Sequence, residues 1–438
     1  MVQLSERSWV PGEAEKWVQA MAARVSTTGA DGIDERLHGL VERNRHIHEV
    51  ETLNLNPATN TMNPRAEALL SAGLGSRPSL GYPGQKCEMG LEAIEEIEVM
   101  AAELAAEVFG ATHAEVRVPS GALANLYAFL ATTDPGDAII APPPEIGGHV
   151  THHRDGAAGL HRLEVHAAPV DAARYSVDID RLREQAHRVR PKLITIGGSL
   201  NLAHHPVGSI RSIADEVGAK VLFDAAHLSG PIAGGTWPSP LAEGAHLMTM
   251  STYKSLGGPP AGLLLTNEAE IAERVDAIAY PGLTANFDVG KTAALVITLL
   301  DWKSHGHSYA REMTKSAQTL ATALAARDVA VHGVDRVWTK SHAFALDART
   351  FGGGHELALR LRRANLLASA IGLPTDTSEA TGGGLRIGLN EAVRWGMRST
   401  DMAELADLVA RAVHDDPDSV AEDVTALRSR FDTLAFVR

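Results

Sequence analysis

Short apolar segments alternate with amphipathic helical segments between about residues 113 and 267, and this alternation is the feature that most constrains the fold. The apolar runs include 192–198 (KLITIGG), 220–227 (KVLFDAAH) and 246–252 (HLMTMST). A helical pattern, 209–218 (SIRSIADEVG), stands between two of them. Strands that alternate with helices in this way predict an α/β fold with a mostly parallel sheet. Ligands of such sheets bind at the carboxyl ends of the strands.

The segments outside this alternation predict two further parts of the chain. Residues 1–50 contain amphipathic patterns typical of helices, so we expect an N-terminal helical segment. Residues 51–290 would then form a large domain around the sheet. A long helical pattern begins near residue 290 and leads into residues 291–438, which we expect to form a smaller C-terminal α+β domain.

The composition limits the kinds of partner that the protein can have. Its 438 residues are 45% hydrophobic, and its formal net charge is −14. An acidic surface argues against nucleic acid or an anionic membrane as the main partner. The N-terminal residues do not resemble a secretion signal, and no apolar run is long enough to span a bilayer. Cys87 is the single cysteine, so no internal disulfide can form, and we expect a cytoplasmic protein.

Two polar residues stand at the ends of consecutive apolar runs. Asp224 closes one run, and Lys254 follows the next. A carboxylate there can pair with a protonated pyridine nitrogen, and a buried lysine has a lowered pKa that lets it form a Schiff base. Taken alone, Asp224 also suits a helix N-cap and Lys254 a surface position. Together they indicate an aromatic cofactor that is bound covalently and carries a phosphate.

The phosphate of such a cofactor needs hydrogen-bond donors. Ser120, Gly121 and Ala122 lie at a predicted strand-to-helix turn, where backbone N–H groups can bind an anion. The hydroxyl groups of Ser251 and Thr252 lie close to Lys254 in the sequence and could contribute as well.

His149, in the segment 147–153 (GGHVTHH), could stack on the cofactor ring. The alternatives are a metal site formed with His152 and His153, or a solvated histidine-rich loop. The spacing of the three histidines matches no strong zinc pattern, and no cysteine is near, so we expect no metal.

Arg386 is flanked by apolar residues in 382–390 (GGGLRIGLN). A guanidinium group in such a setting needs an anionic partner, and its fork suits a carboxylate. The partner is either the carboxylate of a substrate or an acidic side chain in an internal salt bridge.

Together these residues resemble those of the fold-type I pyridoxal-phosphate enzymes, most closely serine (glycine) hydroxymethyltransferase. The resemblance runs from about residue 50 to residue 412. The motifs that carry it are GYPGQK (81–86), VFGATHAEV (108–116), SGALAN (120–125), GGHVTH (147–152), FDAAHLSGPIAGG (223–235), PSPLAEGAHLMTMSTYKSLGGPPAGLLL (238–265) and GLRIG (384–388).

The resemblance implies a cofactor, a substrate class and an assembly. The cofactor would be pyridoxal 5'-phosphate, bound in the domain 51–290, and the substrate an α-amino acid. The family is built from dimers with shared sites, which implies a homodimer here.

Matched position by position, the resemblance also implies roles. Lys254 corresponds to the Schiff-base lysine, Asp224 to the partner of the pyridine nitrogen, and His149 to the ring-stacking histidine. Arg386 corresponds to the arginine that binds the substrate carboxylate. The remaining cofactor contacts are Ser120 and Gly121 at the phosphate, Ser199, and His227 near the phenolic oxygen.

The sequence departs from the family at the residues that serve folate chemistry. The family's catalytic glutamate is replaced by Leu80, and leucine cannot transfer a proton. Further replacements are Pro78 for a tyrosine, Ala58-Thr59-Asn60 for Ser-Glu-Asn, Ala122 for the phosphate-loop serine, Tyr253 for a histidine and Pro260 for an arginine. We therefore expect a folate-independent enzyme rather than an ordinary serine hydroxymethyltransferase.

Two reactions fit this altered set. The first is processing of an S-conjugated cysteine through an external aldimine, by β-elimination or by decarboxylative oxidative deamination. Similar hydroxymethyltransferase-like enzymes act in lincosamide antibiotic biosynthesis, and Tyr253 would act either as a proton donor or as a gate for oxygen chemistry. The alternative is an aldolase or transaldolase of threonine or another β-hydroxy amino acid, with Thr59, His227 and Tyr253 as candidates for handling the hydroxyl proton. A cofactor-binding protein without activity is disfavoured, because it would have no reason to keep Lys254.

Overall fold

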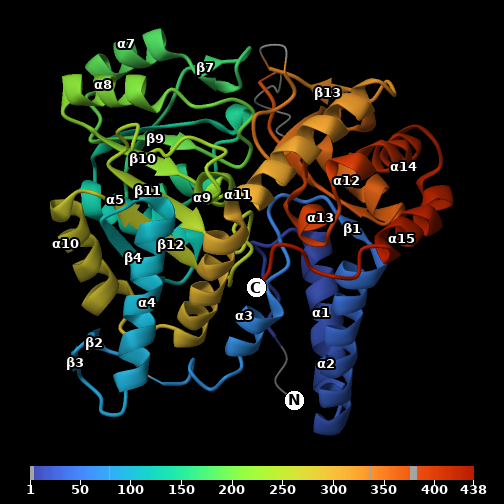
Figure 1. Ribbon diagram of the computed structural model, residues 1–438, viewed down its shortest axis with the longest axis horizontal. Coiled ribbons are helices and arrows are strands. Elements are labelled where there is room, and N and C mark those ends of the chain that lie inside the picture. Colours follow the sequence, from blue (N-terminus) through green and yellow to red (C-terminus); the bar gives the residue numbers. More distant parts are fainter. Residues whose placement is uncertain (1–3, 78, 335–336, 375–381) are drawn as a thin grey trace. The chain divides into compact units, whose positions relative to one another are not determined.

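The computed structural model, which describes residues 4–77, 79–334, 337–374 and 382–438, contains a seven-stranded sheet (Figure 1). Neighbouring strands are parallel except for β12, which is antiparallel to both β11 and β4. The order across the sheet is β4 (His113–Val118), β12 (Gly262–Thr266), β11 (Leu247–Ser251), β10 (Lys220–Asp224), β9 (Leu193–Gly197), β5 (Ala138–Ala141) and β6 (Glu164–Ala167). The predicted α/β fold with a mostly parallel sheet is confirmed.

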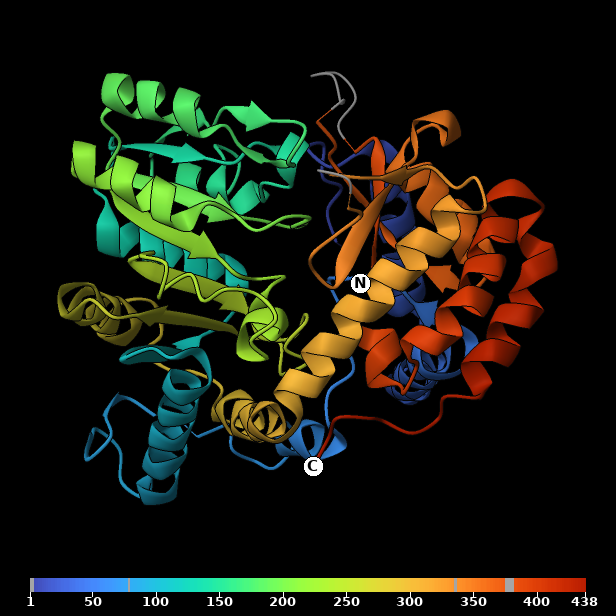
Figure 2. The ribbon, with the colours of Figure 1, turned by 45° about the horizontal axis from the view of Figure 1, so that its top comes forward.

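Alternate residues of the strands face two separate hydrophobic clusters. Leu222 and Leu247 pack in the cluster that includes α5 (Gly121–Thr132), whereas Val221 and Met248 pack in the cluster that includes α8 (Val207–Val217). Because successive side chains of a strand point to opposite faces, helices cover both faces of the sheet (Figure 2). Such strands read as continuous apolar runs, which is why the sequence predicts most of them.

The sequence analysis did not identify β6 or α7 (Ile179–Val189). The strand β6 has the sequence EVHA, and its four residues are partly or fully exposed at the edge of the sheet. Only strands buried on both faces need an uninterrupted apolar sequence, so an edge strand gives a weaker pattern.

Further helices and hairpins complete this part of the chain. Helix α4 (Glu92–Phe109) ends where Gly110 adopts a left-handed conformation with φ 65°. The other elements are α3 (Pro64–Leu69), the hairpin strands β2 (Gly81–Tyr82) and β3 (Gln85–Lys86), α6 (Ala157–Leu160), the hairpin strands β7 (Val170–Asp171) and β8 (Ser176–Val177), α9 (Ser229–Ala233) and α10 (Ala269–Ala277).

The long helix α11 (Val289–Ala325) leads to a four-stranded antiparallel sheet. The order of this sheet is β13 (Val331–His332), β14 (Ala343–Asp347), β17 (Gly384–Gly388) and β16 (Ser369–Ile371). Four helices accompany it: α12 (Gly354–Arg363), α13 (Asn390–Arg394), α14 (Met402–His414) and α15 (Ala421–Ser429).

A short segment near residue 54 pairs with residues that lie more than 300 positions later in the chain. The strand β1 (Leu53–Asn54) is parallel to β15 (Leu366–Leu367), and the Leu55 carbonyl accepts the N–H of Gly388 at 2.8 Å. Residues near position 55 are therefore placed beside the strand that carries Arg386.

The chain divides into one compact unit that ends at Thr52 and a second unit, Leu53–Arg438. The first unit contains α1 (Gly12–Thr27), α2 (Ala30–Arg45) and a π-helical turn, His46–Glu51. The proposed domain boundary at residue 290 lies inside the second unit and stays a prediction. No helix in the described ranges is both long enough and apolar enough to cross a membrane.

Candidate active site

A cavity of about 130 Å³ lies where β4, β9, β10 and β11 end. These are the carboxyl ends of mutually parallel strands, where an α/β sheet binds its ligand. The cavity brings together ten of the residues singled out from the sequence and three others. Its lining residues are Ser120, Gly121, Ala122, Asn125, His149, Gly198, Ser199, Asp224, Ala226, His227, Ser251, Tyr253 and Lys254.

Asp224 is the last residue of β10 and is buried. Its Oδ2 accepts hydrogen bonds from His152 Nε2 at 2.8 Å and Asn125 Nδ2 at 3.0 Å, and its Oδ1 accepts one from the Ala226 N–H at 2.9 Å. Burial alone would raise the pKa of Asp224, but the hydrogen bonds and the positive charge of His152 lower it below its usual value. Asp224 is therefore a fixed, ionised carboxylate at the floor of the cavity.

Lys254 follows β11 and is also buried. Burial lowers the pKa of its amine to about 8; the Asp224 carboxylate opposes this shift, and Arg386 adds to it. A substantial share of the amine is thus unprotonated at mildly alkaline pH, which a nucleophilic lysine requires.

The three histidines of 149–153 face different partners. Nδ1 of His149 is 2.9 Å from Thr151 Oγ1, and burial lowers the pKa of His149 to about 4. His152 bonds to Asp224, while His153 Nε2 donates to the Pro142 carbonyl at 2.9 Å. No group of three metal-ligating side chains converges in the described ranges.

The turn from β4 into α5 forms a tight cradle beside Ser251. Ser120 caps α5, because its Oγ accepts the N–H of Leu123 at 3.2 Å. A Cβ added at Gly121 would overlap Ser251 Oγ and lie 3.2 Å from Ser251 Cβ. Only glycine fits there, and the backbone N–H groups at the start of α5 are open to an anion.

Arg386 lies on β17 and reaches the cavity wall. Its Nη1 donates to the Ser199 carbonyl at 2.9 Å and is 3.4 Å from His227 Nε2. Withdrawal from water lowers the pKa of Arg386 to about 10, so the guanidinium keeps its charge at neutral pH. Among the described residues no acidic side chain forms a salt bridge with Arg386, which favours a substrate carboxylate as its partner over an internal ion pair.

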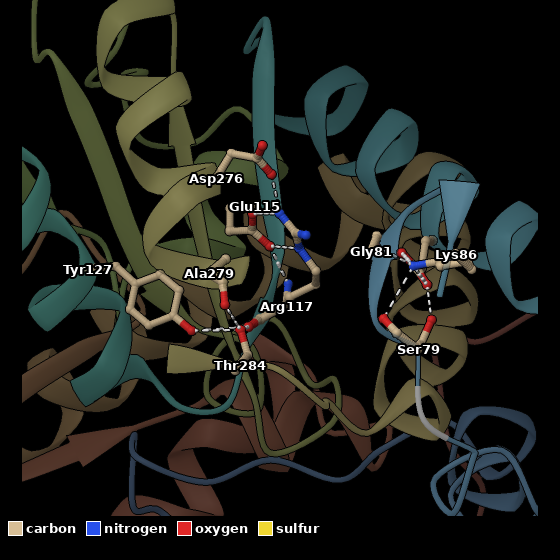
Figure 3. Close-up of polar contacts among 10 residues, drawn as sticks. Ser79, Gly81, Lys86, Glu115, Arg117, Tyr127, Asp276, Ala279 and Thr284 are labelled. Atoms are coloured by element: carbon tan, nitrogen blue, oxygen red, sulfur yellow. Dashed lines mark hydrogen bonds and ion pairs between the residues drawn. The ribbon is translucent and has the colours of Figure 1, made fainter. Parts of the chain in front are cut away.

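None of the three predicted substrate residues is among the residues that line the cavity: Arg386 contacts Ser199 and His227 of its wall, whereas Thr59 and Leu80 have other neighbours. Thr59 Oγ1 is 3.2 Å from Glu391 Oε2 and accepts a hydrogen bond from Asn54. Leu80 precedes the β2–β3 hairpin, which is fixed by Lys86: the Lys86 amine contacts Glu98 at 2.8 Å and donates to the Gly81 carbonyl at 2.9 Å (Figure 3). Pro78 lies outside the described residues.

Asn125 and His152 are site residues whose roles the sequence analysis missed. Asn125 is a polar residue in an otherwise apolar helix and bonds to both Asp224 and Thr249. That isolated polar residue is a signal that could have been used. His152 is considered from the sequence only as a metal ligand, and its contact with a carboxylate 72 residues away leaves no local pattern.

The residues of the cavity fit pyridoxal phosphate. A buried amine and a buried ionised carboxylate come from adjacent strands, since Asp224 is in register with Thr249 of β11. The helix N-terminus and the Gly121 cradle provide a place for a phosphate. His149 also lines the cavity.

Comparison with known proteins agrees with this geometry. The family model "Serine hydroxymethyltransferase" matches residues 31–409. The chain is 59% identical over 434 residues to an alpha-methylserine aldolase of Variovorax paradoxus, covering 99% of both proteins. It is 53% identical over 437 residues to an alpha-methylserine aldolase of a Ralstonia species, covering 99% of this chain and all of that one. It is also 36% identical over 408 residues to a serine hydroxymethyltransferase of Methanopyrus kandleri, covering 92% and 95%. The chain belongs to the serine hydroxymethyltransferase family of fold-type I, pyridoxal-phosphate-dependent enzymes.

Proposed function

We propose that this enzyme is a folate-independent aldolase that cleaves α-methylserine, or a closely related α-alkyl serine, into alanine and formaldehyde. The observation that carries the proposal is the identity of 53–59%, over essentially the whole chain, to proteins named alpha-methylserine aldolase. Leu80 in place of the family's catalytic glutamate supports a reaction without folate. This favours the aldolase alternative; the similarity lends no support to processing of S-conjugated cysteines.

The reaction breaks one carbon–carbon bond. The β-hydroxyl loses its proton, its oxygen forms the C=O of formaldehyde, and the electron pair of the Cα–Cβ bond stays on Cα. A proton then adds to Cα to give alanine. Bound pyridoxal phosphate supplies the electron sink for this pair.

The residues around the cavity have separable tasks in this proposal. Arg386 would bind the substrate carboxylate and thereby orient the bonds at Cα. Asp224 would hold a positive charge at the ring nitrogen of the cofactor, and Lys254 would provide its covalent attachment. His149 would contact the cofactor ring.

Two of the three candidates for handling the hydroxyl proton line the cavity, His227 and Tyr253. Burial lowers the pKa of His227 well below its usual value, so its ring is neutral and one nitrogen can accept a proton. Tyr253 adjoins Lys254 in the chain. Thr59, the third candidate, is occupied with Glu391 and Asn54.

The assembly and location remain proposals. We propose a homodimer, because the family is typically oligomeric. We also propose that the protein is cytoplasmic.

The decisive experiment incubates the purified holoenzyme with α-methylserine in the absence of folate. We expect formaldehyde and alanine in equal amounts, and at least a ~1,000-fold lower rate for Lys254→Ala, as for removal of a nucleophile. Threonine, which would yield acetaldehyde, and cysteine S-conjugates, which would yield pyruvate, are run in parallel. Formaldehyde release that requires added tetrahydrofolate, or turnover of the conjugates alone, would contradict the proposal.

A further inference from the structure

The side chain of Arg386 is held from behind by a hydrogen-bonded relay. Its Nε donates to Ser369 Oγ at 2.8 Å, and Ser369 Oγ donates to Asn56 Oδ1 at 3.0 Å. Ser369 lies on β16 directly opposite Arg386 in the strand register, whereas Asn56 comes from a segment 313 residues away. The relay therefore joins two neighbouring strands, β16 and β17, to the distant segment that carries Asn56.

The far end of the relay is itself anchored. Asn56 Oδ1 also accepts the N–H of Ala58 at 3.1 Å, and the N–H of Asn56 donates to Asn54 Oδ1 at 3.0 Å. Asn54 Nδ2 in turn donates to Glu391 Oε2 at 2.8 Å and to Thr59 Oγ1 at 2.8 Å. Asn54 and Glu391 are buried, so Asn56 is held on a fixed loop rather than a free one.

This arrangement decides which edge of the guanidinium can meet a ligand. A carboxylate can bind bidentately across Nε and Nη2 or across Nη1 and Nη2. Ser369 occupies Nε, so the first edge is closed. For Nη2 no hydrogen bond is recorded within the described residues. The edge formed by Nη1 and Nη2 is available to an incoming carboxylate if the carboxylate replaces one of the two neighbours of Nη1, the Ser199 carbonyl or His227.

We infer that Ser369 and Asn56 are positioning residues that turn the Nη1–Nη2 end of Arg386 toward the substrate carboxylate. The inference rests on the proposed function only in taking an α-amino acid as the substrate. Neither residue lines the cavity, and both act through Arg386.

The test measures ligand binding to the holoenzyme from the change in cofactor absorbance. The two ligands are α-methylalanine, which carries a carboxylate but has no hydroxyl to cleave, and isopropylamine, which lacks the carboxylate. For Ser369→Ala we expect about 10-fold weaker binding of α-methylalanine, from the loss of one charge-assisted hydrogen bond, and unchanged binding of isopropylamine. Ser369→Thr, which keeps the hydroxyl, should restore most of the affinity.

A buried serine on α11, whose hydroxyl bonds to Glu312 rather than to Arg386, gives a matched control: Ser316→Ala should leave the binding of both ligands unaffected. Asn56→Ala should act like Ser369→Ala, and the double variant should be no weaker than either single one, because both break the same relay. Equal weakening of both ligands, or no change for α-methylalanine, would overturn the inference. If wild-type enzyme discriminates the two ligands as described but leaves α-methylserine intact, the proposed function fails and this inference stands.

Discussion

His152 donates a hydrogen bond from Nε2 to Oδ2 of Asp224 across 2.8 Å, with both side chains buried. A carboxylate carries no hydrogen, so the imidazole must be protonated at Nε2. Asn125 and the Ala226 N–H occupy further lone pairs of the same carboxylate. Asp224 is thus oriented from three sides before a cofactor nitrogen reaches it.

The first prediction concerns this contact. His152→Phe removes a hydrogen bond that lowers the pKa of Asp224, so that pKa should rise. Loss of a charged hydrogen bond should weaken pyridoxal-phosphate binding about 10- to 100-fold. The loss of cofactor affinity should grow as the pH falls, because a protonated Asp224 cannot pair with a pyridinium nitrogen. Titration of apoenzyme with cofactor measures the affinity.

The neighbouring His153 offers a control for the first prediction. It bonds to a backbone carbonyl rather than to Asp224, so His153→Phe should change cofactor affinity far less. Equal losses for the two variants would show that the effect is loop distortion and not the contact with Asp224.

The second prediction concerns the pH dependence of cofactor capture. The pKa of Lys254 is lowered to about 8, and only the unprotonated amine attacks an aldehyde. The rate at which apoenzyme captures pyridoxal phosphate should therefore rise with pH, with a midpoint near that value. Asp224 raises the pKa of Lys254, so Asp224→Asn should move the midpoint to lower pH. Arg386 lowers it, so Arg386→Met should move the midpoint to higher pH. Stopped-flow absorbance gives the rates, and shifts of the same sign in both variants would refute the assignment.

The third prediction concerns the cradle beside Ser251. Gly121→Ala forces a methyl group against the Ser251 side chain, which the buried strand end cannot easily move. We expect at least about 10-fold weaker cofactor binding, since overpacking typically costs ~1–3 kcal/mol. Ser251→Gly in the same chain removes the overlapping atoms and should recover part of the loss. If the double variant is worse than Gly121→Ala, steric overlap is not the cause.

The fourth prediction concerns stability rather than catalysis. Asp301 and Arg394 form a buried ion pair at 3.1 Å, and Asp301 also accepts hydrogen bonds from Asn63 and the N–H of Arg438. Asp301→Ala leaves Arg394 buried without this partner and should cost ~3–5 kcal/mol in the free energy of unfolding. Urea unfolding of the holoenzyme measures the change.

An exposed ion pair supplies the comparison for Asp301. Asp407 lies 2.6 Å from Arg327 near the surface, so Asp407→Ala should cost less than ~1 kcal/mol. Similar losses for both variants would mean that burial does not amplify the Asp301 contact.

The parts of the site that the sequence predicts are those encoded locally. Asp224 and Lys254 end consecutive apolar runs, and parallel strands bring their carboxyl ends to one edge, so proximity follows from the pattern. Ser120 and Gly121 follow from the same rule. Asp224 is oriented by His152, and Arg386 contacts Ser369, which bonds to Asn56. The His152–Asp224 and Ser369–Asn56 contacts join residues far apart in the sequence, so they leave no periodic signal.

The sequence does not predict the edge strand β6 for a related reason. A strand at the edge of a sheet has exposed residues and therefore needs no continuous apolar run. Leu80 and Thr59 were placed near the substrate by resemblance alone. The contacts within one chain put Leu80 beside a hairpin and Thr59 beside Glu391, so their roles toward substrate stay predictions.

The pairing of Leu53–Asn54 with Leu366–Leu367 has a consequence for biosynthesis. The cofactor-facing strands, 113–266, leave the ribosome well before Ser369, Arg386 and Glu391 exist. A nascent chain halted between these points would contain the predicted cofactor-binding residues but would lack Arg386, the predicted ligand of the substrate carboxylate. Under the proposed role of Arg386, substrate binding would thus become possible last, after residues 366–367 have paired with residues 53–54.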